Sequence, residues 1–296
     1  MLLALADVSV VSILVGVLGG LALFLYGMQE MSGGLKAAAG DGMKRLLERL
    51  TTNRFAAALT GASVTALIQS SSVTTVLVVG FVSAGLMSLQ QSVGVIMGAN
   101  VGTTVTAQIV AFKVTSFAWV MVAGGFLITT LSHRDRFRDY GTMLLGLGLL
   151  FLGMDQMSQA TDPLRTYQPF VELMRRTEQP LIGICLGALF TALVQSSSAT
   201  TGIVVLLASQ GFLSLEAGIA MALGANIGTC FTAALAAIGK PIEAVRAAVV
   251  HVIFNVIGVC LWLGFISQLA DAARAVSPIA GDLEGVAKLA AETPRQ

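Results

Sequence analysis

The stretch Gln69-Ser70-Ser71-Ser72-Val73-Thr74-Thr75 is rich in hydroxyl groups and lies inside a long apolar segment. The pattern returns 126 residues later as Gln195-Ser196-Ser197-Ser198-Ala199-Thr200-Thr201. At the same offset, Gly98-Ala99-Asn100 falls on Gly224-Ala225-Asn226. Eleven positions in 61–76 are identical to their partners in 187–202, and no gap is needed. The chain is therefore built from two homologous halves.

The composition is that of a membrane protein. Of the 296 residues, 55% are hydrophobic and 11% are charged, and the mean hydropathy is +0.85. An ordinary soluble domain is about 25% charged. The net charge of +1 leaves no basic field of the kind that nucleic-acid binding needs, so no nucleic-acid partner is expected.

The segments around the two motifs have an unusual length. Residues 55–87 and 181–213 are too long for one membrane span of about 17 to 25 residues and too short for two spans with a loop. We therefore predict a re-entrant helical hairpin in each half, with the motif at its tip. A half then crosses the membrane three times, so the second half must be inverted relative to the first.

These features predict an all-α polytopic membrane protein with two inverted-topology repeats, each with a re-entrant helical hairpin. The first repeat covers residues 1–140, the second covers 141–270, and a polar tail covers 271–296. The polar segments that connect the predicted spans on one side of the membrane hold ten Lys or Arg residues. Those on the other side, together with the tail, hold seven, so the first set is expected to be cytoplasmic. Residues 35–50 carry apolar residues among charges at near-helical spacing, as an interfacial helix would.

The motifs favour binding of an oxyanion together with a cation. No Lys or Arg lies in either motif segment, so an anion there must be held by hydroxyls, by free N–H groups at helix N-termini and by bound cations. Sodium, as a hard cation, accepts neutral oxygen ligands, and we expect the amides of Gln69, Gln195, Asn100 and Asn226 to supply them. The full set of predicted substrate and ion ligands is Gln69, Ser70, Ser71, Ser72, Thr74, Thr75, Asn100, Thr103, Thr104, Gln195, Ser196, Ser197, Ser198, Thr200, Thr201, Asn226 and Thr229.

The doubled motifs, each followed by its Gly-Ala-Asn sequence, resemble the type II sodium-phosphate cotransporter family from about Gly19 to Val259. The resemblance implies sodium-driven symport of inorganic phosphate by alternating access, with both motifs at the site. It also implies a multi-pass protein of the plasma (inner) membrane. Because similar family members continue through a further hydrophobic segment, and bacterial ones often through a cytoplasmic helical domain, we expect this chain to be a fragment.

Several alternatives stay open. Hydroxyl donors do not distinguish phosphate from another oxyanion, and they do not distinguish uptake from export. A membrane protein that senses phosphate or acts as a scaffold without transporting it is a further alternative. Small and hydroxyl residues also serve simple helix packing in membranes. His251 and Asn255 lie one turn apart, and we favour a packing hydrogen bond over proton coupling. Neither half offers a nucleophile with a convergent His and carboxylate, so no enzyme is expected.

The expected partners are inorganic phosphate, sodium and the lipid bilayer, and a homo-oligomer is left open. Sodium is the coupling ion and no other cofactor is predicted. The cysteines Cys185, Cys230 and Cys260 lie in apolar stretches without metal-ligand spacing and are expected to serve packing.

Overall fold

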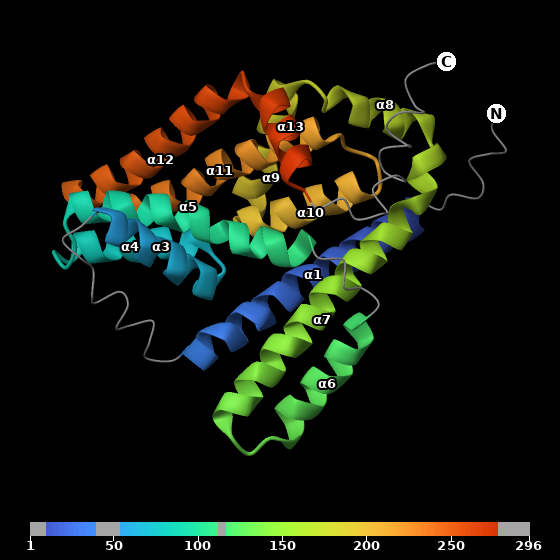
Figure 1. Ribbon diagram of the computed structural model, residues 1–296, viewed down its shortest axis with the longest axis horizontal. Helices are drawn as coiled ribbons and strands as arrows, with labels where there is room; N and C mark the ends of the chain where they lie inside the picture. The colour runs from blue at the N-terminus through green and yellow to red at the C-terminus, as the bar shows by residue number, and fades with distance from the viewer. Residues whose placement is uncertain (1–9, 40–53, 112–116, 278–296) are drawn as a thin grey trace.

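The computed structural model describes residues 10–39, 54–111 and 117–277, and every regular element in these ranges is a helix (Figure 1). Four of these helices are long and apolar enough to cross a membrane, judged by length and composition. The prediction of an all-α polytopic membrane protein is confirmed. The four helices are α1 (Val10–Ala39), α5 (Leu89–Ala111), α11 (Leu215–Ala237) and α12 (Ile242–Leu263).

The helices around the motif recur with the same bounds in both halves. In the first half, α3 (Arg54–Ile68) and α4 (Ser71–Ser83) precede α5. In the second half, α9 (Pro180–Val194) and α10 (Ser197–Ser209) precede α11. Each of these helices begins and ends 126 residues after its counterpart, so the repeat in sequence is also a repeat in local structure.

The remaining helices pair less regularly. When the bounds of α1 are shifted by 126 residues, they largely coincide with those of α7 (Asp135–Thr161). The bounds of α6 (Ala118–Leu131), shifted in the same way, fall within α12. Helix α6 packs along α7 and away from the motif helices (Figure 1). The short elements are η3 (Asp162–Thr166), α8 (Gln168–Arg176) and α13 (Ile266–Val276). The predicted interfacial segment 35–50 begins inside α1, and its residues 40–50 lie outside the described residues.

Helices α1 and α7 run antiparallel and pack through glycines. A Cβ on Gly20 would lie 2.8 Å from the Gly153 carbonyl oxygen, and one on Gly27 would lie 2.6 Å from that of Gly146. Gly146 is the repeat partner of Gly20, and Gly153 is the repeat partner of Gly27. Exchanging each glycine for its partner therefore turns the Gly20–Gly153 contact into the Gly27–Gly146 contact. The contact is self-complementary, as at a twofold axis.

The motif helices are held by equally close contacts within each half. A Cβ on Gly98 of α5 would overlap the Ala58 carbonyl of α3, and one on Gly224 of α11 would overlap the Ile184 carbonyl of α9. Small residues let membrane helices approach until their backbones touch. The glycines that the sequence repeats therefore set the distance between each motif and the long helix beside it.

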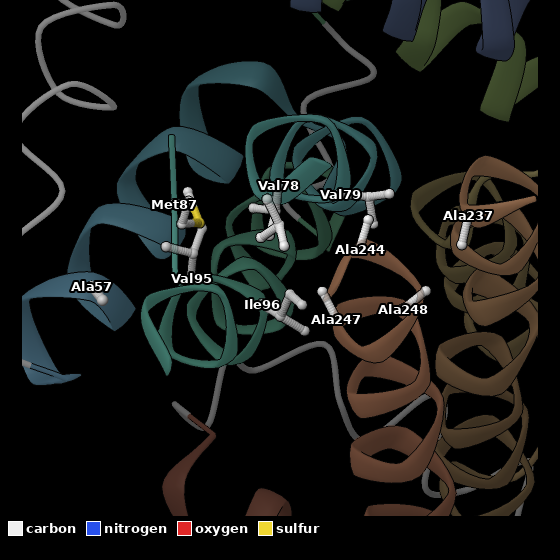
Figure 2. Packing of buried hydrophobic residues seen from close by; sticks show 11 residues of the cluster. Ala57, Val78, Val79, Met87, Val95, Ile96, Ala237, Ala244, Ala247 and Ala248 are labelled. Atoms are coloured by element: carbon white, nitrogen blue, oxygen red, sulfur yellow. The ribbon is translucent and has the colours of Figure 1, made fainter. Parts of the chain in front are cut away.

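The two halves join through their motif helices. Helix α4 contacts α11 and α12, and α10 contacts α5. Figure 2 shows the apolar cluster at one of these joints, where Val78 and Val79 of α4 and Ile96 of α5 meet Ala244 and Ala247 of α12. Each short helix after a motif is thus buried against helices of the opposite half.

Candidate functional site

The chain breaks its helix at each motif. Gln69 and Gln195 have φ angles of 59° and 56°, and they are the only non-glycine residues with positive φ in the described part of the chain. This left-handed conformation is uncommon for a residue with a side chain and stops the preceding helix. Ser70 and Ser196 follow in extended conformation and cap the next helices, accepting the N–H of Val73 at 3.3 Å and of Ala199 at 3.2 Å.

Behind each cap lie two buried serines with unused hydroxyls. Ser71, Ser72, Ser197 and Ser198 are each less than a tenth exposed. No hydrogen bond among the described residues uses their hydroxyl groups. They stand in the first turn of α4 and α10, where backbone N–H groups also lack a partner within the helix and the dipole is positive. We call the break between the two helices of each half and the two serines after it, residues 69–72 and 195–198, the tip. Each tip therefore presents hydroxyl and backbone N–H donors suited to an anion.

A buried pair of threonines clamps the two arms of each tip. Thr65 of α3 donates its hydroxyl to that of Thr74 of α4 at 2.9 Å, and Thr74 donates in turn to the Ser70 carbonyl at 3.1 Å. In the second half, the hydroxyls of Thr191 and Thr200 lie 2.6 Å apart, and Thr200 donates to the Ser196 carbonyl at 3.1 Å. All four threonines are at most 1% exposed. The predicted ligands Thr74 and Thr200 are thus committed to holding the tip.

The first tip is held from outside the hairpin as well. Gln69 is 4% exposed, and its Oε1 accepts a hydrogen bond of 2.8 Å from the Thr106 hydroxyl of α5. Its Nε2 donates to the carbonyl oxygen of Ala66. The hydroxyl of Ser32, on α1, donates to the Ile68 carbonyl at 2.6 Å. The carbonyl just before the break therefore has a partner.

The amides predicted to bind sodium fall into two groups. Gln69 is engaged as described, and Asn100 donates to Oδ1 of Asn255 at 3.0 Å. Gln195 and Asn226 are exposed, and their side chains make no hydrogen bond with the described residues. The structure records no contact that brings the four amides together. Within the described residues there is also no cluster of three or more His, Cys, Asp or Glu side chains suited to a metal ion.

The remaining predicted ligands mostly bond to their own helices. Each donates its hydroxyl to a carbonyl three or four residues earlier, as is common for threonine in apolar helices. These residues are Thr103, Thr104, Thr201 and Thr229. Thr75 differs, because its buried hydroxyl has no hydrogen-bond partner among the described residues.

Helix α12 meets the first half through a polar contact. Asn255 accepts the Asn100 bond and donates its own Nδ2 to the His251 carbonyl at 2.9 Å. The packing role expected of Asn255 is therefore observed. The His251 ring takes no part in it, because both of its nitrogens are buried and have no partner within residues 10–39, 54–111 and 117–277.

Four residues that act on the tips were missed as site residues: Thr65, Thr191, Thr106 and Ser32. Thr65 and Thr191 are partners at the offset of 126, and Thr106 and Ser32 have the identical partners Thr232 and Ser158. That identity was a usable signal for all of them. Without the fold, however, nothing in the sequence places residues 32 and 106 next to residues 68 and 69.

A helical membrane protein whose two halves each offer anion donors at a broken helix has the features of a transporter. The chain matches the Na+/Pi-cotransporter family over residues 23–159 and 169–281, and it belongs to that family. The family is one of transporters, not of enzymes.

Curated relatives point the same way. The chain is 34% identical to "Uncharacterized protein YqeW" of Bacillus subtilis over 86% of this chain and 83% of the relative. It is 28% identical to "Putative inorganic phosphate export protein YjbB" of Escherichia coli K12 over 87% of this chain and 48% of the relative, so it spans about half of that protein. Over 85 residues it is 42% identical to "Sodium-dependent phosphate transport protein 2C" of Rattus norvegicus, covering 27% of this chain and 14% of the relative. No solved structure matches the chain.

Proposed function

We propose that the protein carries inorganic phosphate, coupled to sodium, across the plasma membrane by alternating access. The observation that carries this proposal is the set of four buried serines with unused hydroxyls, two at the start of α4 and two at the start of α10. A tetrahedral oxyanion has enough acceptor oxygens to take hydrogen bonds from both tips. Ser71, Ser72, Ser197 and Ser198 are its principal ligands.

The packing of the halves supports a single site between them. Each motif helix is buried against helices of the opposite half, α4 on α11 and α10 on α5. The antiparallel, self-complementary contact of α1 with α7 supports an inverted relation of the halves. A twofold axis that relates two antiparallel helices is perpendicular to both of them, so for helices that span the membrane it lies in the membrane plane. Inverted halves of this kind can expose one midplane site to either side in turn.

The charge balance at the tips supports coupling to a cation. Helices α4, α5, α9, α10 and α11 contain no Lys or Arg. A phosphate ion in an apolar bundle without a compensating positive charge is costly, because hydroxyl and N–H dipoles offset only part of the lost hydration. A sodium ion bound at the same time neutralises part of that charge and uses the exposed amide oxygens of Gln195 and Asn226.

The direction of net transport and the choice of anion are separate questions. Export is a second candidate because the printed name of YjbB describes a putative phosphate exporter. Arsenate and sulfate share the tetrahedral oxygens that the hydroxyls recognise. Uptake is proposed here because an inward sodium gradient drives a symporter inward.

The test is transport of radiolabelled phosphate in proteoliposomes made with the full chain. An inward sodium gradient should give accumulation, and replacement of sodium by choline should abolish it. Excess unlabelled phosphate should compete more strongly than arsenate or sulfate. Vesicles preloaded with phosphate under an outward gradient test export. Binding of phosphate with no movement in either direction overturns the transport proposal and favours the sensor reading.

A further inference from the structure

The two tips share the Gln-Ser-Ser-Ser sequence but make different hydrogen bonds. In the first half, Thr106 donates to the Gln69 side chain at 2.8 Å and Ser32 donates to the Ile68 carbonyl at 2.6 Å. The offset of 126 places Thr232 and Ser158 at the equivalent positions of the second half. Neither Thr232 nor Ser158 makes a side-chain hydrogen bond to any residue that the structure describes, and the Thr232 hydroxyl is fully buried.

Thr232 occupies the position in the second half that Thr106 occupies in the first. Thr106 sits one helical turn after Gly102, and Thr232 sits one turn after Gly228. A Cβ on Gly102 would lie 2.7 Å from the Thr65 Cβ, and one on Gly228 would lie 2.6 Å from the Thr191 Cβ. The long helix and the hairpin arm thus pack with the same register in both halves, and Thr232 has the same relation to the second tip as Thr106 has to the first.

The glutamines of the two tips also differ in burial and in hydrogen bonding. Gln69 is 4% exposed and bonded, whereas Gln195 is exposed and its amide is free of bonds to the described residues. A buried hydroxyl without a partner is costly, by the loss of a hydrogen bond that water or another group would otherwise supply. In this conformation the Thr232 hydroxyl lowers stability, and a valine of the same shape would not. Because the equivalent Thr106 uses its hydroxyl on Gln69, a bond from Thr232 to Gln195 in a different conformation would account for this hydroxyl.

We propose that Thr106 with Ser32, and Thr232 with Ser158, form two alternative latches that hold the tips in opposite phases of the transport cycle. In the conformation described here, the first latch is closed on Gln69 and the second is open. In the opposite conformation, Gln195 turns inward and accepts the Thr232 hydroxyl, Ser158 bonds the Val194 carbonyl, and Gln69 is released. These four residues are positioning residues. The inference rests on the proposed transport function for its meaning, but the exchange of bonds can be measured without any ligand.

The experiment is chemical bridging of cysteine pairs by mercury(II) in the full chain, reconstituted in lipid, with Cys185, Cys230 and Cys260 replaced by alanine. One variant carries Gln69→Cys with Thr106→Cys, and the other carries Gln195→Cys with Thr232→Cys. Bridging is read as loss of both thiols to a maleimide and gain of one mercury by mass spectrometry. Single-cysteine variants show the background.

Both pairs should be bridged, although only the first is in contact in this structure. Adding Thr106→Val or Ser32→Ala to the second pair should raise its bridging rate by about two- to tenfold, since each removes one hydrogen bond from the closed latch. Thr106→Ser keeps the hydroxyl and should leave the rate unchanged. Thr60→Val is the matched control, because the Thr60 hydroxyl bonds only the Ala56 carbonyl of its own helix.

Bridging of the first pair alone, bridging of neither pair, or a rate at the second pair that ignores Thr106→Val overturns the latch. Phosphate uptake by the unsubstituted protein judges the transport function separately. Uptake without bridging at the second pair removes the latch and keeps transport. Bridging without phosphate binding keeps the latch and removes the proposed function.

Discussion

Removal of the Thr200 hydroxyl tests whether this residue contacts the substrate or holds the tip. The hydroxyl meets that of Thr191 at 2.6 Å and donates to the Ser196 carbonyl at 3.1 Å, and both threonines are at most 1% exposed. Thr200→Val keeps the shape and deletes both bonds. At about 0.5–1.5 kcal/mol per buried hydrogen bond, the variant should lose about 1–3 kcal/mol of stability.

A double-mutant cycle with Thr191→Val separates the two roles. If the pair is a clamp, each single substitution lowers the thermal midpoint in detergent, and the double variant costs about 1 kcal/mol less than the sum of the two. Thr200→Ser, which keeps the hydroxyl, should restore most of the loss. Additive losses from the two singles would refute the clamp. A Thr200→Val variant with unchanged stability and abolished phosphate binding would show that the residue is a ligand instead.

Three further predictions concern contacts between helices. Gly98→Ala should destabilise the protein by about 1–3 kcal/mol, because its Cβ overlaps the Ala58 backbone, whereas Gly19→Ala meets nothing within 4 Å and should be neutral. Asn255→Ala should lower the thermal midpoint by loss of its 3.0 Å bond with Asn100, and a midpoint equal to that of the unsubstituted protein would contradict this polar link between the halves. Arg274→Gln should leave stability unchanged at physiological salt, since its 2.7 Å ion pair with Glu216 is largely exposed; a clear loss would assign α13 a larger role.

The helix order and the position of the break could be predicted because they are local properties. Two copies of a motif within long uncharged segments fix where the apolar helices lie. The break follows because Gln69 ends one helix and Ser70 is a favoured cap for the next. The same reasoning holds for Gln195 and Ser196, which repeat this geometry in the second half.

The roles of individual site residues could not be predicted to the same extent. A threonine that binds a ligand and one that binds a neighbouring threonine look alike in sequence, so the sequence places Thr74 and Thr200 among the substrate and ion ligands and does not separate that role from holding the tip. The difference between Gln69 and Gln195 could not be predicted either, because both occupy the same place in the same Gln-Ser-Ser-Ser motif and both have a threonine at the equivalent position of the next long helix, yet only Gln69 is hydrogen-bonded to it. The same Gln-Ser-Ser-Ser sequence is therefore bonded through its glutamine in one half and exposed in the other.

A shared, sodium-dependent phosphate site between the two tips can be tested by equilibrium binding of radiolabelled phosphate to the purified full chain. Binding is measured with sodium or choline for the unsubstituted protein, Ser71→Ala and Ser197→Ala. We expect one phosphate per chain in sodium, much weaker binding in choline, and a similar loss from either substitution. Two phosphates per chain, or a loss from only one of the two substitutions, would contradict a single shared site.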